Sequence, residues 1–174
     1  MASLVLTVIG DDRSGLVSAL SGVIADHGGS WERSQMARLA GKFAGIVLVE
    51  VSDDRAEDLI GALGPLGTEG LLDVTVERAG DEAPLSNDLT RLSLELVGAD
   101  RPGIVHDISQ ALAARQVSIE ELHTATREAP MVGGMLFEAT ATLLAPPTVP
   151  IADLQTVLED LANELMVDLS LSAD

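Results

Sequence analysis

The sequence predicts an α+β protein built from two tandem βαββαβ units, each a four-stranded antiparallel sheet with two helices on one face. Three observations predict it: an internal repeat, strand-like and helix-like apolar patterns that alternate within each copy, and a polar segment between the copies. A chain of 174 residues with 47% hydrophobic residues can bury one ordinary core or two small ones, so the repeat decides between them.

The repeat is clearest at a glycine-containing octapeptide. Gly-Asp-Asp-Arg-Ser-Gly-Leu-Val at residues 10–17 returns as Gly-Ala-Asp-Arg-Pro-Gly-Ile-Val at residues 98–105. Between the copies, a segment with turn formers, acidic residues and a proline is typical of a linker. We therefore expect a first domain at residues 1–79, a linker at residues 80–89 and a second domain at residues 90–174.

Each copy begins with an apolar strand that leads into an amphipathic helix. Residues 4–9 have the pattern of a central strand buried on both faces, and residues 92–97 repeat it more weakly. The first helix should end at residues 27–29, which contain two glycines. After the strand, the apolar residues take helical spacing in both copies: Leu16, Val17, Leu20, Val23 and Ile24, then Ile104, Val105, Ile108 and Leu112.

A strand pair, a second helix and a closing strand complete each copy. The βαββαβ order places the first and third strands, which are the most apolar, at the centre of the sheet. The alternate residues Val5 and Ile9 are also apolar, so the face opposite the helices should be covered by the other copy or by another chain. The expected strands include residues 30–39, 43–51, 117–127 and 133–144, and the second helices contain Ala56, Leu59, Ile60, Leu63, Leu154, Val157, Leu158, Leu161 and Leu165.

The charge and the missing cysteines exclude several classes of function. With 28 acidic and 10 basic residues, the net charge of −18 would repel nucleic-acid phosphates and anionic lipid, so we expect no direct nucleic-acid or membrane contact. The absence of cysteine excludes disulfides and cysteine nucleophiles and fits a reducing compartment. The start of the chain lacks the pattern of a signal peptide. We expect a cytoplasmic protein.

No catalytic or metal-binding motif is recognisable. His27, His106 and His123 lack metal-ligand spacing, and neither a phosphate-binding P-loop nor a nucleophile elbow is present. His106 falls in the first turn of a predicted helix, where it could touch a ligand. We therefore expect no catalytic residue, metal or cofactor, although an enzyme on this scaffold stays a third possibility because a fold does not fix a function.

The loop between the first strand and the first helix of each copy suits an anion. Its Gly-x-Asp-Arg-x-Gly sequence brings backbone N–H groups and a helix N-terminus together, and Gly15 and Gly103 allow a ligand close to the main chain. Pro102, near the first helical position, fits its fixed φ. In the alternative interpretation the glycines only make a tight turn, and Asp12 and Asp100 cap the helices.

The two arginines of these loops also have two interpretations. Arg13 and Arg101 could pair with an anionic ligand, or they could form a solvated ion pair with the neighbouring aspartate. The sequence alone does not decide between them.

At these loops the chain resembles the ACT-domain family, in particular its two-domain regulators. Asp-Arg-Pro-Gly-Ile-Val at residues 100–105 looks like the family signature ahead of the first helix, and the resemblance covers nearly the whole chain. The first copy departs from the signature at Ser14, where proline is usual, and Asp11 adds a negative charge. The resemblance implies a ferredoxin-like fold with a small-molecule site, usually for an amino acid, at an interface between two such domains.

Carried over by position, the resemblance assigns the ligand site to one loop in each copy. The implied ligand residues are Asp100, Arg101, Pro102, Gly103, Ile104 and Val105 in the second copy, and Asp12, Arg13, Ser14, Gly15, Leu16 and Val17 in the first.

We therefore expect a non-catalytic regulatory protein that binds an amino acid such as glycine or serine. The acidic charge favours action on metabolism or transcription through a protein partner over contact with an operator. A homo-oligomer, in the simplest case a dimer, is also expected. The alternative is a structural regulatory subunit that docks onto a metabolic enzyme and has no ligand of its own.

Overall fold

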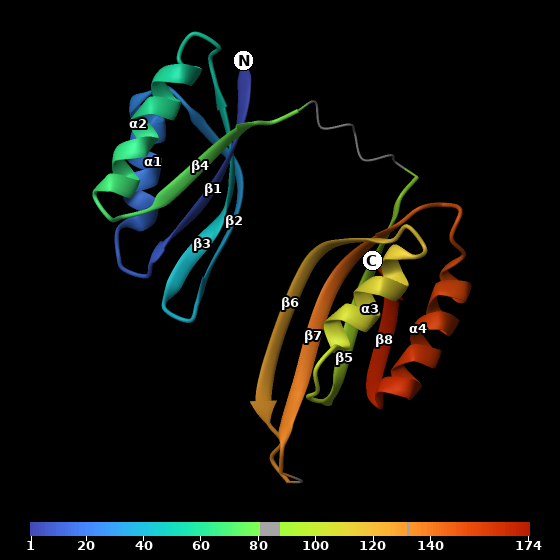
Figure 1. Cartoon of the computed structure of the whole chain (residues 1–174). Coiled ribbons are helices and arrows are strands. Elements are labelled where there is room, and N and C mark those ends of the chain that lie inside the picture. The colour runs from blue at the N-terminus through green and yellow to red at the C-terminus, as the bar shows by residue number, and fades with distance from the viewer. Residues whose placement is uncertain (81–87, 132) are drawn as a thin grey trace. The chain divides into compact units, whose positions relative to one another are not determined.

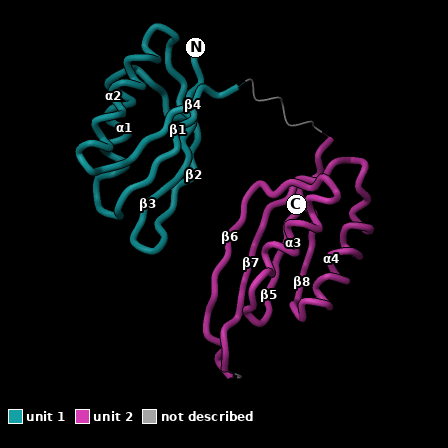
Figure 2. Tube along the Cα trace, in the orientation of Figure 1, with its two compact units in different colours: residues 1–82 teal, residues 83–174 magenta. Residues whose placement is uncertain are grey.

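The chain forms two compact units, residues 1–82 and residues 83–174, which Figure 2 shows in different colours. The structure, a computed structural model, describes residues 1–80, 88–131 and 133–174. The linker predicted at residues 80–89 lies mostly outside the described residues, so the predicted domain limits stay predictions.

The first unit has the βαββαβ order expected from the sequence (Figure 1). The sheet order is β2-β3-β1-β4 with antiparallel neighbours, which confirms the central place of the first and third strands. Both helices lie on one face of the sheet. The elements are β1 (Ala2–Asp11), α1 (Leu16–Asp26), β2 (Ser30–Leu39), β3 (Lys42–Val51), α2 (Ala56–Thr68) and β4 (Asp73–Arg78).

The second unit repeats this architecture. Its sheet order is β6-β7-β5-β8, again antiparallel, and the two helices again share one face. In both units the outer strand has a bulge at the same place, after Trp31 in β2 and after Ile119 in β6. The elements are β5 (Thr90–Ala99), α3 (Ile104–Ala113), β6 (Ser118–Glu128), β7 (Met135–Ala145), α4 (Ile151–Leu165) and β8 (Val167–Ala173).

Each unit has its own hydrophobic core between its sheet and its helices. Successive side chains of a strand point to opposite faces, so one set of alternate residues enters the core. In β1 the core residues are Leu4, Leu6 and Val8, each at most 1% exposed, whereas Ile9 on the opposite face is 47% exposed. Within the first unit, the apolar central strand is therefore fully buried on the helix side only.

Two glycines of the first unit, Gly10 at the end of β1 and Gly22 in α1, should change its stability in opposite directions when replaced by alanine. A Cβ atom at Gly10 would lie 2.3 Å from the carbonyl oxygen of Leu71, so Gly10→Ala should destabilise the unit by about 1–3 kcal/mol. Gly22 lies within α1 with open space around its Cα, so Gly22→Ala should stabilise by roughly 0.5–1 kcal/mol. Urea denaturation followed by the fluorescence of Trp31, the single tryptophan, measures both changes in this unit.

Candidate ligand-binding loops

Two equivalent loops carry the predicted ligand residues. The first loop, residues 12–15, joins β1 to α1, and the second loop, residues 100–103, joins β5 to α3. A backbone hydrogen bond to the neighbouring strand pair anchors each loop. The N–H of Asp12 donates to the Gly41 carbonyl at 2.9 Å, and the N–H of Asp100 donates to the Met135 carbonyl at 2.8 Å.

Both helices begin at a glycine in the left-handed conformation. Gly15 has φ 90° and Gly103 has φ 92°, and neither helix start has a side-chain cap. The alternative in which Asp12 and Asp100 cap the helices is therefore wrong, because the chain makes a further turn before helical geometry begins. Pro102 lies directly before the N-cap Gly103, two residues ahead of the first helical residue, Ile104.

The uncapped start of α3 leaves backbone donors available. The first N–H groups of an α-helix have no acceptor within the helix, and in α3 these belong to Ile104, Val105 and His106. The helix dipole adds positive potential at the same place. Because the side chain of Ile104 is buried in the core, this turn is held firmly against the sheet.

Groups of the chain itself engage the charged side chains of the first loop. The Arg38 guanidinium forms an ion pair with Asp12 at 3.3 Å, and Arg13 donates to the Gly70 carbonyl at 3.3 Å. Lys42 pairs with Asp11, and this hydrogen bond and charge hold the pKa of the Asp11 carboxyl below its usual range. The interpretation in which Arg13 forms an ion pair with the neighbouring Asp12 is therefore wrong, because Asp12 pairs with Arg38 instead.

The charged side chains of the second loop are differently placed. Within the described residues, Asp100, Arg101 and Asp107 form no side-chain hydrogen bond or ion pair. Asp107, in the first turn of α3, lies close to the loop, since its Oδ2 would be 3.9 Å from a Cβ atom at Gly103. Asp107 thus lies at the uncapped helix start, and Asp100 and Arg101 belong to the loop that precedes it.

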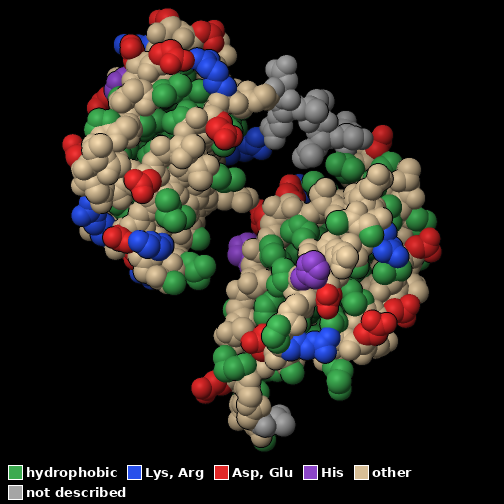
Figure 3. Space-filling model, in the orientation of Figure 1, with side chains coloured by type: hydrophobic (Ala, Val, Ile, Leu, Met, Phe, Trp, Pro, Cys, Tyr) green, Lys and Arg blue, Asp and Glu red, His purple; other side chains and the backbone are tan. Residues whose placement is uncertain are grey.

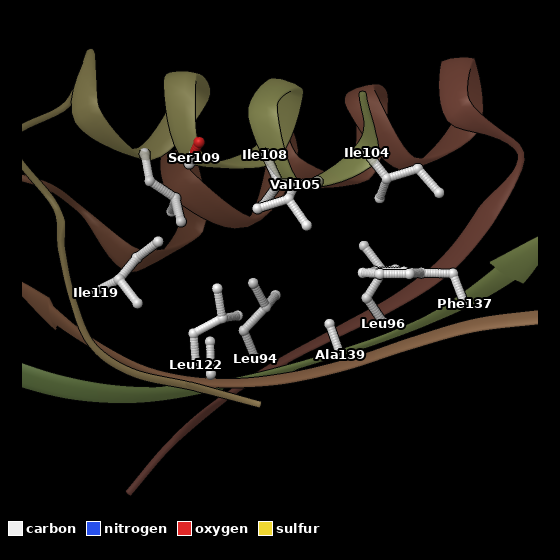
Figure 4. Close-up of a pocket in the computed structure, with 12 residues that line it drawn as sticks. Leu94, Leu96, Ile104, Val105, Ile108, Ser109, Ile119, Leu122, Phe137 and Ala139 are labelled. Atoms are coloured by element: carbon white, nitrogen blue, oxygen red, sulfur yellow. The ribbon is translucent and has the colours of Figure 1, made fainter. Parts of the chain in front are cut away.

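An apolar groove opens beside the second loop, between α3 and the strands β6 and β7 (Figure 4). Figure 3 shows hydrophobic side chains gathered between α3 and β6 on the same face. In Figure 4, Phe137 lies below Ile104, and Ile119 lies at the opposite end, below Ser109. The lining residues are Leu94, Leu96, Ile104, Val105, Ile108, Ser109, Leu112, Ile119, Leu122, Phe137, Ala139 and Ala141.

Larger side chains occupy the equivalent region of the first unit. Trp31 and Met36 pack against the core there, and a Cβ atom at Gly45 would lie 2.7 Å from Cγ of Met36. By strand register, Ile119 takes the place of Trp31, and Ala139 takes the place of Gly45. An alignment of the two copies shows these substitutions. The helical and strand periodicities that predict the fold do not show that they leave a groove in the second unit.

The sequence reasoning missed Asp107 as a candidate. The signal was its position four residues after Gly103, one helical turn along α3, where the first copy has Ala19. Among the three histidines, His106 is exposed in the first turn of α3, and Nδ1 of His27 lies 2.8 Å from the Val23 carbonyl oxygen. The described residues contain no cluster of histidine and carboxylate groups suited to a metal ion and no helix long and apolar enough to cross a membrane.

Comparison with known families and structures agrees with this architecture. Residues 2–77 and residues 92–145 each match a sequence profile of the ACT domain. No curated protein matches the chain.

Two solved structures cover nearly the whole chain. A crystal structure described as "an Unknown Protein from Galdieria sulphuraria" is 30% identical with a TM-score of 0.86, and the match covers 99% of this chain and 98% of that one. A protein named "putative glycine cleavage system transcriptional repressor" is 19% identical with a TM-score of 0.75, covering 99% and 97%, and shows the shared fold. The chain belongs to the ACT-domain family and carries two ACT domains in tandem.

Proposed function

We propose that this chain is a non-catalytic regulatory protein that binds an amino acid at the second loop and the first turn of α3. The observation that carries the proposal is the contrast between the loops. In the first loop Asp12 and Arg13 bind groups of the chain, whereas in the second loop Asp100 and Arg101 have no such partner among the described residues.

The chemistry of the second loop fits an amino acid better than a simple anion. The N–H groups at the start of α3 and the Arg101 guanidinium would bind the carboxylate. Asp107, with Asp100 nearby, would bind the α-ammonium group. The ligand side chain would then lie toward the apolar groove, which begins at Ile104 and Val105.

The apolar groove should affect which amino acid binds most tightly. Glycine and serine, the examples expected from the sequence, need little room and would leave the groove in contact with water. An aliphatic side chain would cover Val105, Ile119 and Leu122, which are 42%, 37% and 44% exposed, and each buried CH₂ would add roughly 0.8 kcal/mol. The proposal is therefore an amino acid at this site, with aliphatic ones favoured.

A thermal-shift screen of the full chain against the twenty amino acids tests the proposal. A ligand that binds only the folded state stabilises it by about 2.7 kcal/mol at 100 times its Kd, which raises the unfolding midpoint by several degrees. A selective rise with one amino acid or a related group is the expected result. No rise with any of the twenty would contradict the proposal.

The role of Asp107 gives a sharper prediction. Asp107→Asn should weaken amino-acid binding about tenfold, because a charge-assisted hydrogen bond contributes roughly 1.5–3 kcal/mol and the amide keeps part of it. The 2-oxo acid with the same side chain lacks the ammonium group, so its affinity should not change. Titration calorimetry with both ligands measures the difference, and Arg101→Ala, which should weaken both, is the control. Equal weakening of both ligands by Asp107→Asn would show that Asp107 does not bind the ammonium group.

We propose that the chain exerts its regulatory effect by binding a protein partner. The net charge of −18 disfavours contact with nucleic acid, so control of metabolism or transcription would act on another protein. The exposed apolar groove also supports the alternative, a partner-docking subunit without a ligand. Copurification of a stable partner with an empty second loop would favour that alternative. The cytoplasmic location stays a prediction.

A further inference from the structure

The outer face of the first unit, meaning the sheet face opposite α1 and α2, has an apolar centre. Val5 and Ile9 of β1 and Ile46 and Leu48 of β3 lie on this face, since the residues that alternate with them enter the core. Ile9 is 47% exposed and Ile46 is 51% exposed. Four large aliphatic side chains on two adjacent strands are a feature of sheet faces that pack against another surface.

The second unit provides an internal comparison for this face. By strand register, Ser93 takes the place of Val5, and Thr140 and Thr142 take the places of Ile46 and Leu48. The sheet topology is the same, but the centre of the second outer face is polar and includes Glu95, and only Val97, in the place of Ile9, is aliphatic among the four equivalent positions. The fold therefore does not require an apolar outer face, and the aliphatic residues of the first unit need a separate explanation.

The charges at the two edges of the first outer face are opposite in sign. One row of the register runs from Arg33 on β2 through Leu48 and Val5 to Glu77 on β4. A further acidic residue, Asp73, also faces outward on β4. The outer face of β2 thus contributes one basic residue, Arg33, beside the uncharged Gln35, Ala37 and Leu39, whereas the middle is mostly aliphatic and β4 contributes two carboxylates.

This pattern is complementary to itself. If two such sheets stack face to face about a twofold axis parallel to their strands, β2 of one molecule lies over β4 of the other. Arg33 then meets the Glu77 side of the second molecule, while Leu48 and Val5 meet in the middle. Each contact occurs twice, as in an isologous interface.

The distribution of charge favours the first unit as the associating one. Residues 1–80 contain six of the ten basic residues but only twelve of the 28 acidic ones, so the first unit repels a second molecule less than the second unit does. The outer face of the second unit is poorly suited to pack against the outer face of the first unit, because Glu95 at its centre would be buried against aliphatic side chains without a partner.

We propose that two molecules of this chain form a homodimer by stacking the outer faces of their first units, with β2 of each over β4 of the other. The proposal names the surface and the orientation of the dimer. It does not depend on amino-acid binding, because the stacked face is on the opposite side of the sheet from the helices and lies in the first unit.

Sedimentation velocity of the full chain over a range of concentrations tests the proposal. Ile46→Asp should raise the dimer Kd at least about 100-fold, because it buries a charge at the apolar centre. Thr140→Asp, at the equivalent place in the second unit, is the matched control and should leave the Kd unchanged. A monomer at all concentrations, or a dimer that persists in Ile46→Asp, would overturn the proposal.

A charge exchange tests the orientation. Arg33→Glu and Glu77→Arg should each weaken the dimer about tenfold, because each places like charges over one another twice. The double variant, Arg33→Glu with Glu77→Arg, should return the Kd to near the original value. A double variant as weak as the sum of the single ones would overturn the stacking of β2 over β4. A dimer disrupted instead by Ile119→Asp would place the interface at the groove of the second unit and equally overturn it.

Discussion

Gly103→Val should abolish the amino-acid-dependent rise in the unfolding midpoint and weaken binding by about 100-fold or more. Gly103 has φ 92°, a conformation that a β-branched residue rarely adopts, so the substitution should turn the N–H groups at the start of α3 away from the ligand. Loss of two hydrogen bonds to a carboxylate, at roughly 1.5–3 kcal/mol each, accounts for an effect of this size. Arg101→Ala should weaken binding less, since it leaves the backbone donors in place.

The equivalent glycine of the first loop is the control for this prediction. Gly15 has φ 90°, so Gly15→Val should strain its helix start as much as Gly103→Val strains the other. It should lower the stability of the first unit and leave amino-acid affinity unchanged. Equal loss of affinity in both variants would contradict the assignment of binding to the second loop.

The second large effect is expected from filling the groove. Ile119→Trp introduces the residue that the first unit carries at the equivalent position, where Trp31 packs against the core. The indole should cover the space between α3 and β6 and remove the place of the ligand side chain. We expect the affinity for an aliphatic amino acid to fall at least about tenfold, since roughly 1.5–3 kcal/mol of apolar burial would be lost.

This variant should leave the fold intact, which distinguishes it from a core mutation. Ile119 is 37% exposed, so a larger side chain can extend along the surface without displacing the core. Ile119→Val, which keeps the groove open, should bind almost as the original protein does. Titration calorimetry of both variants is the measurement, and unchanged affinity in Ile119→Trp would exclude the groove from the ligand site.

The fold could be predicted from the sequence because its signals are local and occur twice. The sequence predicts the strand at residues 30–39 with the limits that β2 has, and the first helix ends at Asp26, directly before residues 27–29, where it is expected to end. The duplicated octapeptide showed that both copies share one topology. Apolar spacing then separated strands from helices.

The chemistry of the loops could not be predicted in the same way. Arg38 and Asp12 are 26 residues apart in sequence, and only the pairing of β2 with β3 and the path of the loop bring them together. The capping hypothesis was wrong because sequence does not show how many residues a loop uses before helical geometry begins. The groove exists because of the volumes of side chains on different helices and strands, and the periodicity of apolar residues in the sequence does not predict those volumes.

Amino-acid binding at the second loop can be located by an NMR titration of the full chain, labelled with ¹⁵N, with the amino acid that raises the unfolding midpoint most. We expect the largest amide shifts at residues 103–107, smaller ones along β6, and none at residues 15–19. Shifts concentrated at the first loop, or shifts absent from both loops despite thermal stabilisation, would contradict the claim that the second loop is the amino-acid site.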